Sequence, residues 1–524
     1  MIDLLIKDGL IIDGTGSPGF HATIGITEDT ISILRGDVSD IEAKQVIDAT
    51  GKIVCPGFID VHAHSALMIL DDPQHLPKVH QGVTTELIGV DGNSYAPFTT
   101  QQDLKDFIVL NAGLDGAPPI TPSWLTVSEY LNEYDKKVSV NIAYVVGNSP
   151  IRISAMGWGN RKPTTLESDR MRGLLRESME EGAVGISTGL DYPPGSYADT
   201  DELVDLSKEV AKLGGIYHTH VRYALGDRFL DPYREAIDIG RRSGIPVHLT
   251  HMLPKAAFPG SSMRLIELVD QANLDNLDVT FDCFPYTHGG TRLLFFLPQW
   301  THDGGLATIY EVLQSKESRV RLHKEISLGY RESWADVWLT YFKYDRNKKY
   351  EGWSIEKLAE MTDKTVVNAV CDLLLDDDLQ PCFHSSGPDP MVLPTFFSHP
   401  NLMVGSDGIL VGDYPPASSH GTFPLVISKY CRDDERMSLP DVIRKMTSYP
   451  AHRLGLTGRG LLRDGMKADV VIFDFENINA HATRLNPRRF SSGIEYVIVN
   501  GEIVVDHGKH TGFLPGRALK RGFC

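Results

Sequence analysis

The run that organises this chain is Pro56-Gly57-Phe58-Ile59-Asp60-Val61-His62-Ala63-His64. Its first part is apolar and typical of a buried strand, and its end carries two histidines two residues apart. Because side chains alternate across a strand with a period of two, both imidazoles face the same side and can reach one metal ion. Alone this spacing is a weak signal, since the chain has 19 histidines and a second such pair occurs at His218-Thr219-His220. The motif becomes informative through its position at the end of a candidate strand.

Apolar runs alternate with amphipathic helical stretches on both sides of this motif. Nine runs are candidate strands: 57–64, 84–91, 141–148, 183–190, 216–222, 245–252, 279–286, 382–385 and 402–407. This alternation predicts an α/β fold with a parallel (β/α)8 barrel of the TIM type. A barrel needs eight strands, and the short run at 382–385 is the weakest of the nine. The span 292–350, which contains three tryptophans, breaks the alternation and predicts an inserted lid at about 290–350.

The two ends of the chain read differently, as short strands separated by turns. Asn500-Gly501 stands between two apolar runs and is the strongest short hairpin signal in the sequence. We therefore expect one small β domain built from residues 1–55 and 455–524. The barrel domain would then occupy residues 56–454.

Composition excludes several functional classes. The 524 residues carry a formal net charge of -18, which argues against a nucleic acid or an anionic membrane as the main partner. No apolar run approaches the roughly 18 residues of a membrane span, and the first residues do not resemble a signal peptide. The six cysteines are scattered, without a CxxC pair. We expect a cytoplasmic protein that acts on a small molecule, and a homo-oligomer is possible.

Metal-binding side chains also stand at the ends of four other candidate strands. These residues are Asp91, His220, His251 and Asp407. Active sites of (β/α)8 barrels lie at the carboxyl ends of the strands, so the four would converge with His62 and His64. Such a set predicts a hydrolytic site for one or two metal ions. The alternative is a group of solvated strand-end residues without a metal.

Histidine 248 precedes His251 by three residues and is expected on the opposite face of the same strand. We therefore expect it to be a packed residue on the outside of the barrel.

The whole chain resembles a known family. The run at 56–64 is similar to the signature of the amidohydrolase superfamily, and other stretches resemble the N-acyl-D-amino-acid deacylases, or D-aminoacylases. These stretches are Gln81–Thr85, Ile186–Tyr192, Phe281–Tyr286, Gly405–Gly408, Gly421–Pro424, Arg444–Ser448, Lys467–Val471 and Thr511–Arg517. The resemblance implies a distorted (β/α)8 barrel, a β-sandwich formed by both termini, and zinc.

The resemblance also assigns roles to the strand-end residues. His62 and His64 would hold a more loosely bound metal, His220 and His251 a tighter one, and Asp407 would be the catalytic base. D-aminoacylases bridge the two metal positions with a cysteine in a Gly-Asn-Cys-Gly stretch.

Here the matching stretch reads Gly89-Val90-Asp91-Gly92, so an aspartate stands at the bridging position. No lysine lies in the runs 141–148 or 183–190, which argues against the carboxylated lysine that bridges metals in other branches of the superfamily. A carboxylate is a harder ligand than a thiolate, so Mn2+ or Co2+ is possible beside Zn2+.

Substrate recognition departs from the family pattern. D-aminoacylases hold the substrate carboxylate with a lysine, where this chain has Leu253, and with an arginine before Gly-Thr-Phe-Pro, where residues 414–420 contain none. Arg222, Arg292 or Lys255 could supply the missing charge, with Arg222 the best candidate. Tyr192 is a candidate donor to the oxyanion, and His288 a candidate contact to substrate.

The sequence thus predicts a metal-dependent hydrolase of C–N bonds in which Asp407 activates water. Two alternatives remain open. One is a hydrolase that opens a cyclic amide, imide or lactone, which the two absent cations favour. The other is a non-catalytic scaffold that has kept the barrel and lost its metals.

Overall fold

The structure is a computed structural model that describes residues 2–36, 38, 40–223, 228–253, 260–326 and 333–521. Eight parallel strands form its central sheet in the order β19-β15-β14-β13-β12-β11-β10-β8. Their bounds are Phe58–Asp60 (β8), Val83–Ile88 (β10), Asn141–Gly147 (β11), Gly185–Gly189 (β12), Ile216–His220 (β13), Val247–Leu249 (β14), Val279–Cys283 (β15) and Leu402–Val404 (β19). This arrangement confirms the predicted TIM-type barrel.

Two short strands bring the first and last barrel strands together. β9 (Ala63–His64) pairs with β20 (Gly408–Ile409), with Gly408 opposite Ala63 and Ile409 opposite His64. The histidine motif and the end of the last strand are therefore held side by side by backbone hydrogen bonds.

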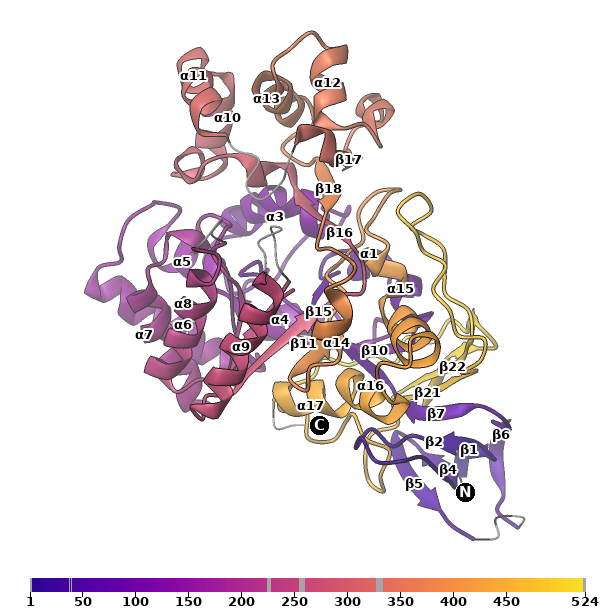
Figure 1. The fold of residues 1–524 in the computed structure, drawn as a ribbon. Coiled ribbons are helices and arrows are strands. Elements are labelled where there is room, and N and C mark those ends of the chain that lie inside the picture. The colour runs from indigo at the N-terminus through magenta and orange to yellow at the C-terminus, as the bar shows by residue number, and fades with distance from the viewer. Residues whose placement is uncertain are drawn as a thin grey trace.

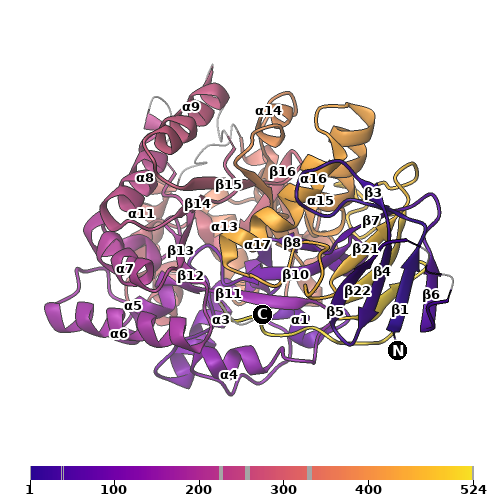
Figure 2. The ribbon, with the colours of Figure 1, turned by 90° about the horizontal axis from the view of Figure 1, so that it is seen from below.

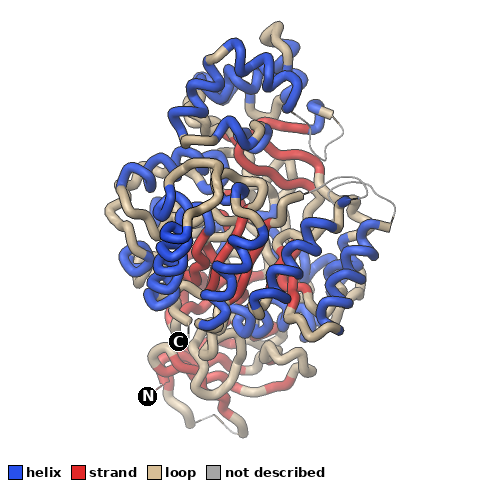
Figure 3. The backbone as a smooth tube through the Cα atoms, turned by 90° about the vertical axis from the view of Figure 1, so that its left-hand side faces the viewer, coloured by secondary structure: helices blue, strands red, loops and turns tan. Residues whose placement is uncertain are grey.

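Helices cover the outside of the barrel, as Figures 2 and 3 show. The strands inside are buried on both faces, which explains why their sequences are continuous apolar runs rather than alternating ones. Side chains define the helix starts: Thr164 and Glu167 form a capping box at α6 (Thr165–Glu181), and Asp199 caps α7 (Thr200–Lys212). The other helices that follow barrel strands include α3 (Gln101–Asp115), α5 (Asn148–Met156), α8 (Asp231–Ser243), α9 (Ser261–Leu274), α16 (Leu439–Met446) and α17 (Ser448–Leu454).

An insertion with its own sheet stands between β15 and β19, at the top of Figure 1. β18 (Cys382–Ser386) lies between β16 (His288–Arg292) and β17 (Val337–Tyr341), antiparallel to both. The weak ninth run at 382–385 is therefore no barrel strand. The insertion runs from His288 to Ser386, longer than the lid expected at 290–350, and carries α10 (Leu306–Gln314), α11 (Lys316–Glu325), α12 (Ile355–Met361) and α13 (Val366–Asp376).

The two ends of the chain build sheets beside the barrel. One has the order β5-β4-β1-β6, from Thr30–Leu34, Thr23–Thr27, Ile2–Lys7 and Ala43–Asp48. The other has the order β24-β23-β22-β21-β7-β2-β3, from Lys509–His510, Glu502–Asp506, Ile494–Val499, Val470–Phe473, Ile53–Pro56, Leu10–Ile11 and Phe20–His21. A shared apolar core with residues from both sheets includes Ile6, Ile26, Val54 and Ile498.

The predicted hairpin is also present. β22 and β23 are antiparallel neighbours, and the residues between them, Asn500 and Gly501, have φ angles of 49° and 86°. Positive φ at both central positions is what a tight hairpin turn of this kind requires.

Candidate metal centre

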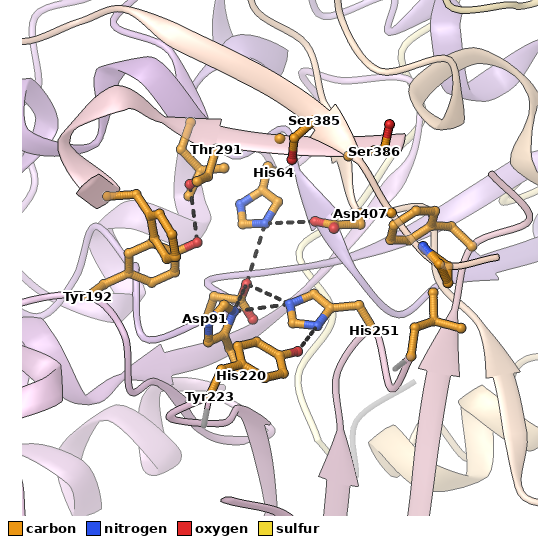
Figure 4. A pocket seen from close by; sticks show the side chains of 18 residues that line it. His64, Asp91, Tyr192, His220, Tyr223, His251, Thr291, Ser385, Ser386 and Asp407 are labelled. Atoms are coloured by element: carbon orange, nitrogen blue, oxygen red, sulfur yellow. Dashed lines mark hydrogen bonds and ion pairs between the residues drawn. The ribbon is translucent and has the colours of Figure 1, made fainter. Parts of the chain in front are cut away.

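Six strand-end side chains converge at the carboxyl face of the barrel. They are His62, His64, Asp91, His220, His251 and Asp407, and Figure 4 labels all of them except His62. Asp91 lies among the four histidines: its Oδ2 is 3.4 to 3.7 Å from the facing nitrogen of each. Asp407 Oδ1 lies 3.4 Å from His62 Nε2 and 3.3 Å from His64 Nε2.

These separations suit ligands that surround a cation. Metal bonds of about 2.0–2.2 Å in a tetrahedral arrangement place neighbouring ligand atoms roughly 3.3–3.6 Å apart. His62 Nε2 is also a buried atom without a hydrogen-bond partner. Buried polar atoms are nearly always satisfied, so this nitrogen is suited to coordinate a cation at the centre. Both the donor set and its spacing therefore fit one or two metal ions.

The backbone is unusual at three of the six residues. Asp91, His251 and Asp407 have φ angles of 54°, 32° and 48°, in a region that residues other than glycine seldom adopt. Each follows the end of a barrel strand, where the chain turns away from the sheet. Such strained positions cluster at functional sites because the surrounding fold holds them in place.

Each histidine of the centre has a partner on its other ring nitrogen. His62 Nδ1 lies 3.2 Å from Asp282 and His64 Nδ1 2.8 Å from Asp115. His220 Nε2 lies 3.1 Å from Asp191 Oδ2, and His251 Nδ1 lies 2.8 Å from Tyr223 Oη. Partners of this kind fix the tautomer and ring orientation of metal-binding histidines.

The expectation for His248 was wrong. Its ring is buried, with Nε2 3.1 Å from Asp282, the same carboxylate that holds His62. β14 ends at Leu249, and the left-handed backbone at His251 breaks the alternation on which the prediction relied.

The charges of the centre are coupled. Burial alone would lower the pKa of His64, but the hydrogen bond to Asp115 and the nearby Asp407 raise it to about 9. Burial likewise opposes the rise of the His220 pKa to about 9, which Asp191 and Asp91 cause. Burial would raise the pKa of Asp407, but His62 and His64 hold it below its ordinary value. Asp407 is therefore ionised at neutral pH, and a cation that enters must displace protons from His64 and His220.

A pocket opens above the centre. Apolar side chains form part of its wall, together with backbone and hydroxyl groups of the inserted sheet; its lining includes Leu114, Leu253, Phe284, Phe295, Gly289, Gly290, Thr291, Ser385 and Ser386. Tyr192 lines it too, and its hydroxyl lies 3.1 Å from Thr291 Oγ1. Among the described residues, no lysine or arginine lines this pocket.

Arg222, Arg292 and His288, the other described candidates for substrate contact, lie outside the pocket wall. Arg222 uses its three nitrogens on Glu235 and on the carbonyls of Ser196 and Ala198. Arg292 is buried behind Tyr192, with Cζ 4.7 Å from the centre of that ring. His288 is half-buried on β16, and Lys255 lies outside the described residues.

Sequence reasoning missed the partners of the histidines. Asp191 and Asp282 had a usable signal, because both stand at the ends of barrel strands, as the ligands do. Asp115 had none, because it is the last residue of the helix α3. Tyr223 follows His220 by three residues, beyond the end of β13.

Comparison with known proteins identifies the family. The Amidohydrolase family matches residues 45–505. The D-aminoacylase of Alcaligenes xylosoxydans xylosoxydans is 31% identical over 526 residues, covering 99% of this chain and 98% of that protein. A solved D-aminoacylase, studied for its binuclear metal centre, has a TM-score of 0.83 at 30% identity, over 99% of this chain and 100% of its own.

A third relative was solved with a ligand. The N-acyl-D-glutamate deacylase from Bordetella bronchiseptica, in complex with zinc and a phosphonate inhibitor, has a TM-score of 0.82 at 29% identity, over 99% of both chains. The present chain belongs to the amidohydrolase family. It is a metal-dependent hydrolase that acts on C–N bonds other than peptide bonds. None of the described helices is long and apolar enough to cross a membrane.

Proposed function

We propose that this chain removes the acyl group from N-acylated D-amino-acid derivatives, with zinc held by His62, His64, His220 and His251. The observation that carries the proposal is the position of Asp91, whose Oδ2 lies within 3.7 Å of a nitrogen of all four histidines. A carboxylate there can bridge two ions, and it also suits Mn2+ or Co2+. The full-length match to three deacylases supports this reaction over the opening of a cyclic substrate.

A metal ion held by His62, His64, His220 and His251 would polarise the scissile carbonyl and lower the pKa of the attacking water. Asp407 accepts the proton that the water loses as its oxygen attacks the carbonyl carbon. When the C–N bond breaks, Asp407 returns this proton to the leaving nitrogen. Asp115, Asp191, Asp282 and Tyr223 hold the imidazoles in place throughout.

We further propose that the substrate carries no free carboxylate on the carbon next to the scissile nitrogen. Leu253 stands in the pocket wall, and no cationic side chain lines that wall among the described residues. A carboxylate there would lose its hydration without a compensating partner. The favoured substrates are therefore those in which the α-carboxyl group is a neutral amide.

The test compares N-acetyl-D-methionine with its carboxamide on the zinc-loaded enzyme. We expect kcat/KM to be at least about tenfold higher for the carboxamide, or about 1.4 kcal/mol in favour of the neutral group. A preference of the same size for the free acid would mean that a cation outside the described wall reaches the substrate. If the enzyme hydrolyses neither compound, and neither of the two L-enantiomers, the deacylase assignment is rejected.

We also propose a cytoplasmic location. Cys55, Cys371, Cys382 and Cys431 are buried thiols outside any disulfide, in keeping with a reducing compartment.

A further inference from the structure

A second layer of polar side chains lies beneath the metal-binding histidines, inside the barrel. His218 precedes His220 by two residues on β13, so its side chain faces the same way, one layer deeper. His248 lies opposite His218 in the pairing of β13 with β14, and Asp282 stands on the neighbouring strand β15. The ring centres of His218 and His248 are 4.9 Å apart, with an angle of 21° between the ring planes. All three side chains of this layer are buried.

The carboxylate of Asp282 faces three nitrogen atoms. Its Oδ2 lies 3.2 Å from His62 Nδ1 and 3.1 Å from His248 Nε2. Its Oδ1 accepts a hydrogen bond of 2.7 Å from the backbone N–H of His251. Burial would raise the pKa of Asp282, but His62 and His248 hold it below its ordinary value. An ionised carboxylate only accepts hydrogen bonds, so both imidazole nitrogens that face it carry a hydrogen atom.

These contacts reach a histidine from each half of the metal centre. His62 Nε2 and His64 Nε2 both lie within 3.4 Å of Asp407 Oδ1, and we call these two histidines the first position. His220 Nδ1 and His251 Nε2 are 3.1 Å apart, and we call these two the second position. Asp282 therefore contacts one histidine of each position.

Asp282 acts on the two positions through different atoms. At the first position it bonds the imidazole of His62, and such a bond fixes the tautomer that leaves the other ring nitrogen free for a metal. At the second position it bonds the main chain of His251, whose φ of 32° is unusual for a residue other than glycine. An acceptor for this buried N–H stabilises the backbone conformation from which the imidazole reaches the centre.

Asp115 offers a contrast, because it contacts the first position only through His64. Its Oδ1 lies 2.8 Å from His64 Nδ1, and its Oδ2 accepts a hydrogen bond from the hydroxyl of Tyr95. It is a carboxylate of the same kind and equally buried. Asp115 is therefore a matched control for Asp282.

We propose that Asp282 is a positioning residue shared by both metal positions, and that His248 holds its carboxylate in place. His248 Nδ1 lies 2.9 Å from the hydroxyl of Thr280, which can donate to it and so leaves the N–H at Nε2 for Asp282. The inference rests on the proposed function, since it takes the four histidines as zinc ligands. It adds that a single buried carboxylate sets the zinc affinity of both positions.

The zinc affinity of each position tests this role. His220→Ala leaves the first position and His64→Ala leaves the second, and competition with a chelator gives the dissociation constant in each background. Adding Asp282→Ala should weaken both positions by at least about tenfold, the usual scale for loss of a group that orients a metal-binding histidine. Adding Asp115→Ala should weaken the first position as much and leave the second within about threefold of its value.

Asp282→Asn separates the two contacts. The amide oxygen can still accept the N–H of His251, but the amide nitrogen then faces His62 Nδ1. This nitrogen would have to accept, so the hydrogen atom of His62 would move to Nε2, the atom that faces the centre. We expect the first position to weaken at least about tenfold and the second to stay within about threefold. If Asp282→Ala is insoluble, Asp282→Val leaves a smaller cavity and gives the same comparison.

His248 is tested by a pair of variants. His248→Phe keeps the ring but removes the donor to Asp282, so both positions should bind zinc more weakly. His248→Gln, whose amide can donate to the same carboxylate, should restore most of the affinity. Equal affinities in these two variants would show that the hydrogen bond from His248 does not hold Asp282.

Two results overturn the shared role. One is a second position that Asp282→Ala leaves within threefold of its value, and the other is an equal loss at both positions in Asp282→Asn. The zinc constants require no substrate. If no N-acetyl-D-amino-acid derivative is hydrolysed, the deacylase assignment fails, while these constants still decide the role of Asp282. A protein that binds zinc in neither background rejects the metal centre and the role of Asp282 together.

Discussion

Asp407 is the more accessible of the two carboxylates in the centre. Its side chain is 16% exposed, against 3% for Asp91. It faces the pocket, where a water molecule and a substrate can both reach it. Asp91 by contrast is enclosed by imidazoles. This difference in exposure supports the proposed roles, with Asp407 as the proton acceptor and Asp91 as a metal ligand.

Asp407→Asn should keep the fold and most of the metal but lower kcat by at least about 100-fold, the usual scale for loss of a general base. The amide oxygen can still donate an electron pair to a metal ion but no longer takes a proton. Metal content by elemental analysis, together with kcat, checks this. Near-wild-type turnover would assign the proton transfer to another group.

Asp91→Cys tests the bridging carboxylate. The thiolate is the softer ligand, so the variant should still bind Zn2+ but lose affinity for Mn2+. The relative affinity for Zn2+ and Mn2+ is measured by competition between the two ions and by titration of the metal-free protein with each ion. An unchanged preference would place Asp91 outside the coordination sphere.

At the scale of elements, the strand ends are held by a buried ionic network below the centre. Asp60 Oδ1 accepts hydrogen bonds from the backbone nitrogens of His62 and Ser406, next to two ligand positions. Lys78 Nζ lies 2.5 Å from Asp60, 2.9 Å from Glu86 and 2.8 Å from Ser406 Oγ. One side chain from α2 (Leu76–Val79) thus connects β8, β10 and the end of β19.

Lys78→Met should destabilise the protein by about 3–5 kcal/mol, since two buried carboxylates lose their cation. Because Asp60 positions His62, we also expect weaker zinc binding. Urea unfolding of the zinc-loaded enzyme and a zinc titration measure the two effects. The control, Lys208→Met, changes an exposed residue of α7 and should alter stability by less than about 0.5 kcal/mol. A Lys78 variant as stable as that control would show that the network contributes nothing.

The elements differ in how well the sequence predicts them. Barrel strands are continuous apolar runs that end in a polar residue, so all eight lie among the nine predicted runs, and the six side chains that converge at their ends could be located directly. β18 has the same local composition but pairs with β16 and β17, and pairing across nearly 100 residues leaves no local trace. The sequence gives no local sign of the role of Asp115 either, because this residue contacts His64 only through the packing of α3 over the barrel. The boundaries at 55/56 and 454/455 stay predictions.

At the scale of the whole molecule, buried neutral histidines make stability depend on pH. Burial, and then Arg292, lower the pKa of His302 to about 3. Between pH 6.5 and 3 the unfolded chain binds a proton at this residue and the native state does not, so stability falls as the pH falls. The change is up to about 1.4 kcal/mol per pH unit, or about 2 kcal/mol from pH 6.5 to 5.

His302→Gln should therefore flatten the pH dependence of the free energy of unfolding over this range. Urea denaturation at several pH values between 6.5 and 5 gives the slope. His452→Gln, at an exposed position of α17, should leave the slope as in the wild type. Equal slopes for wild type and His302→Gln would show that this histidine is protonated in the native state.

The sheet that joins the two ends of the chain also governs the order of assembly during translation. β7 leads directly into the first barrel strand, yet its partner β21 begins at Val470, 414 residues after Pro56. A ribosome that adds about 5–20 residues per second needs roughly 20–80 s to cover that distance. For this time one edge of β7 has no native neighbour, and unpaired edges are where nascent chains aggregate. Slow elongation or loss of the last strands should therefore lower the yield of soluble protein, even though all six side chains that converge at the barrel mouth have already been synthesised.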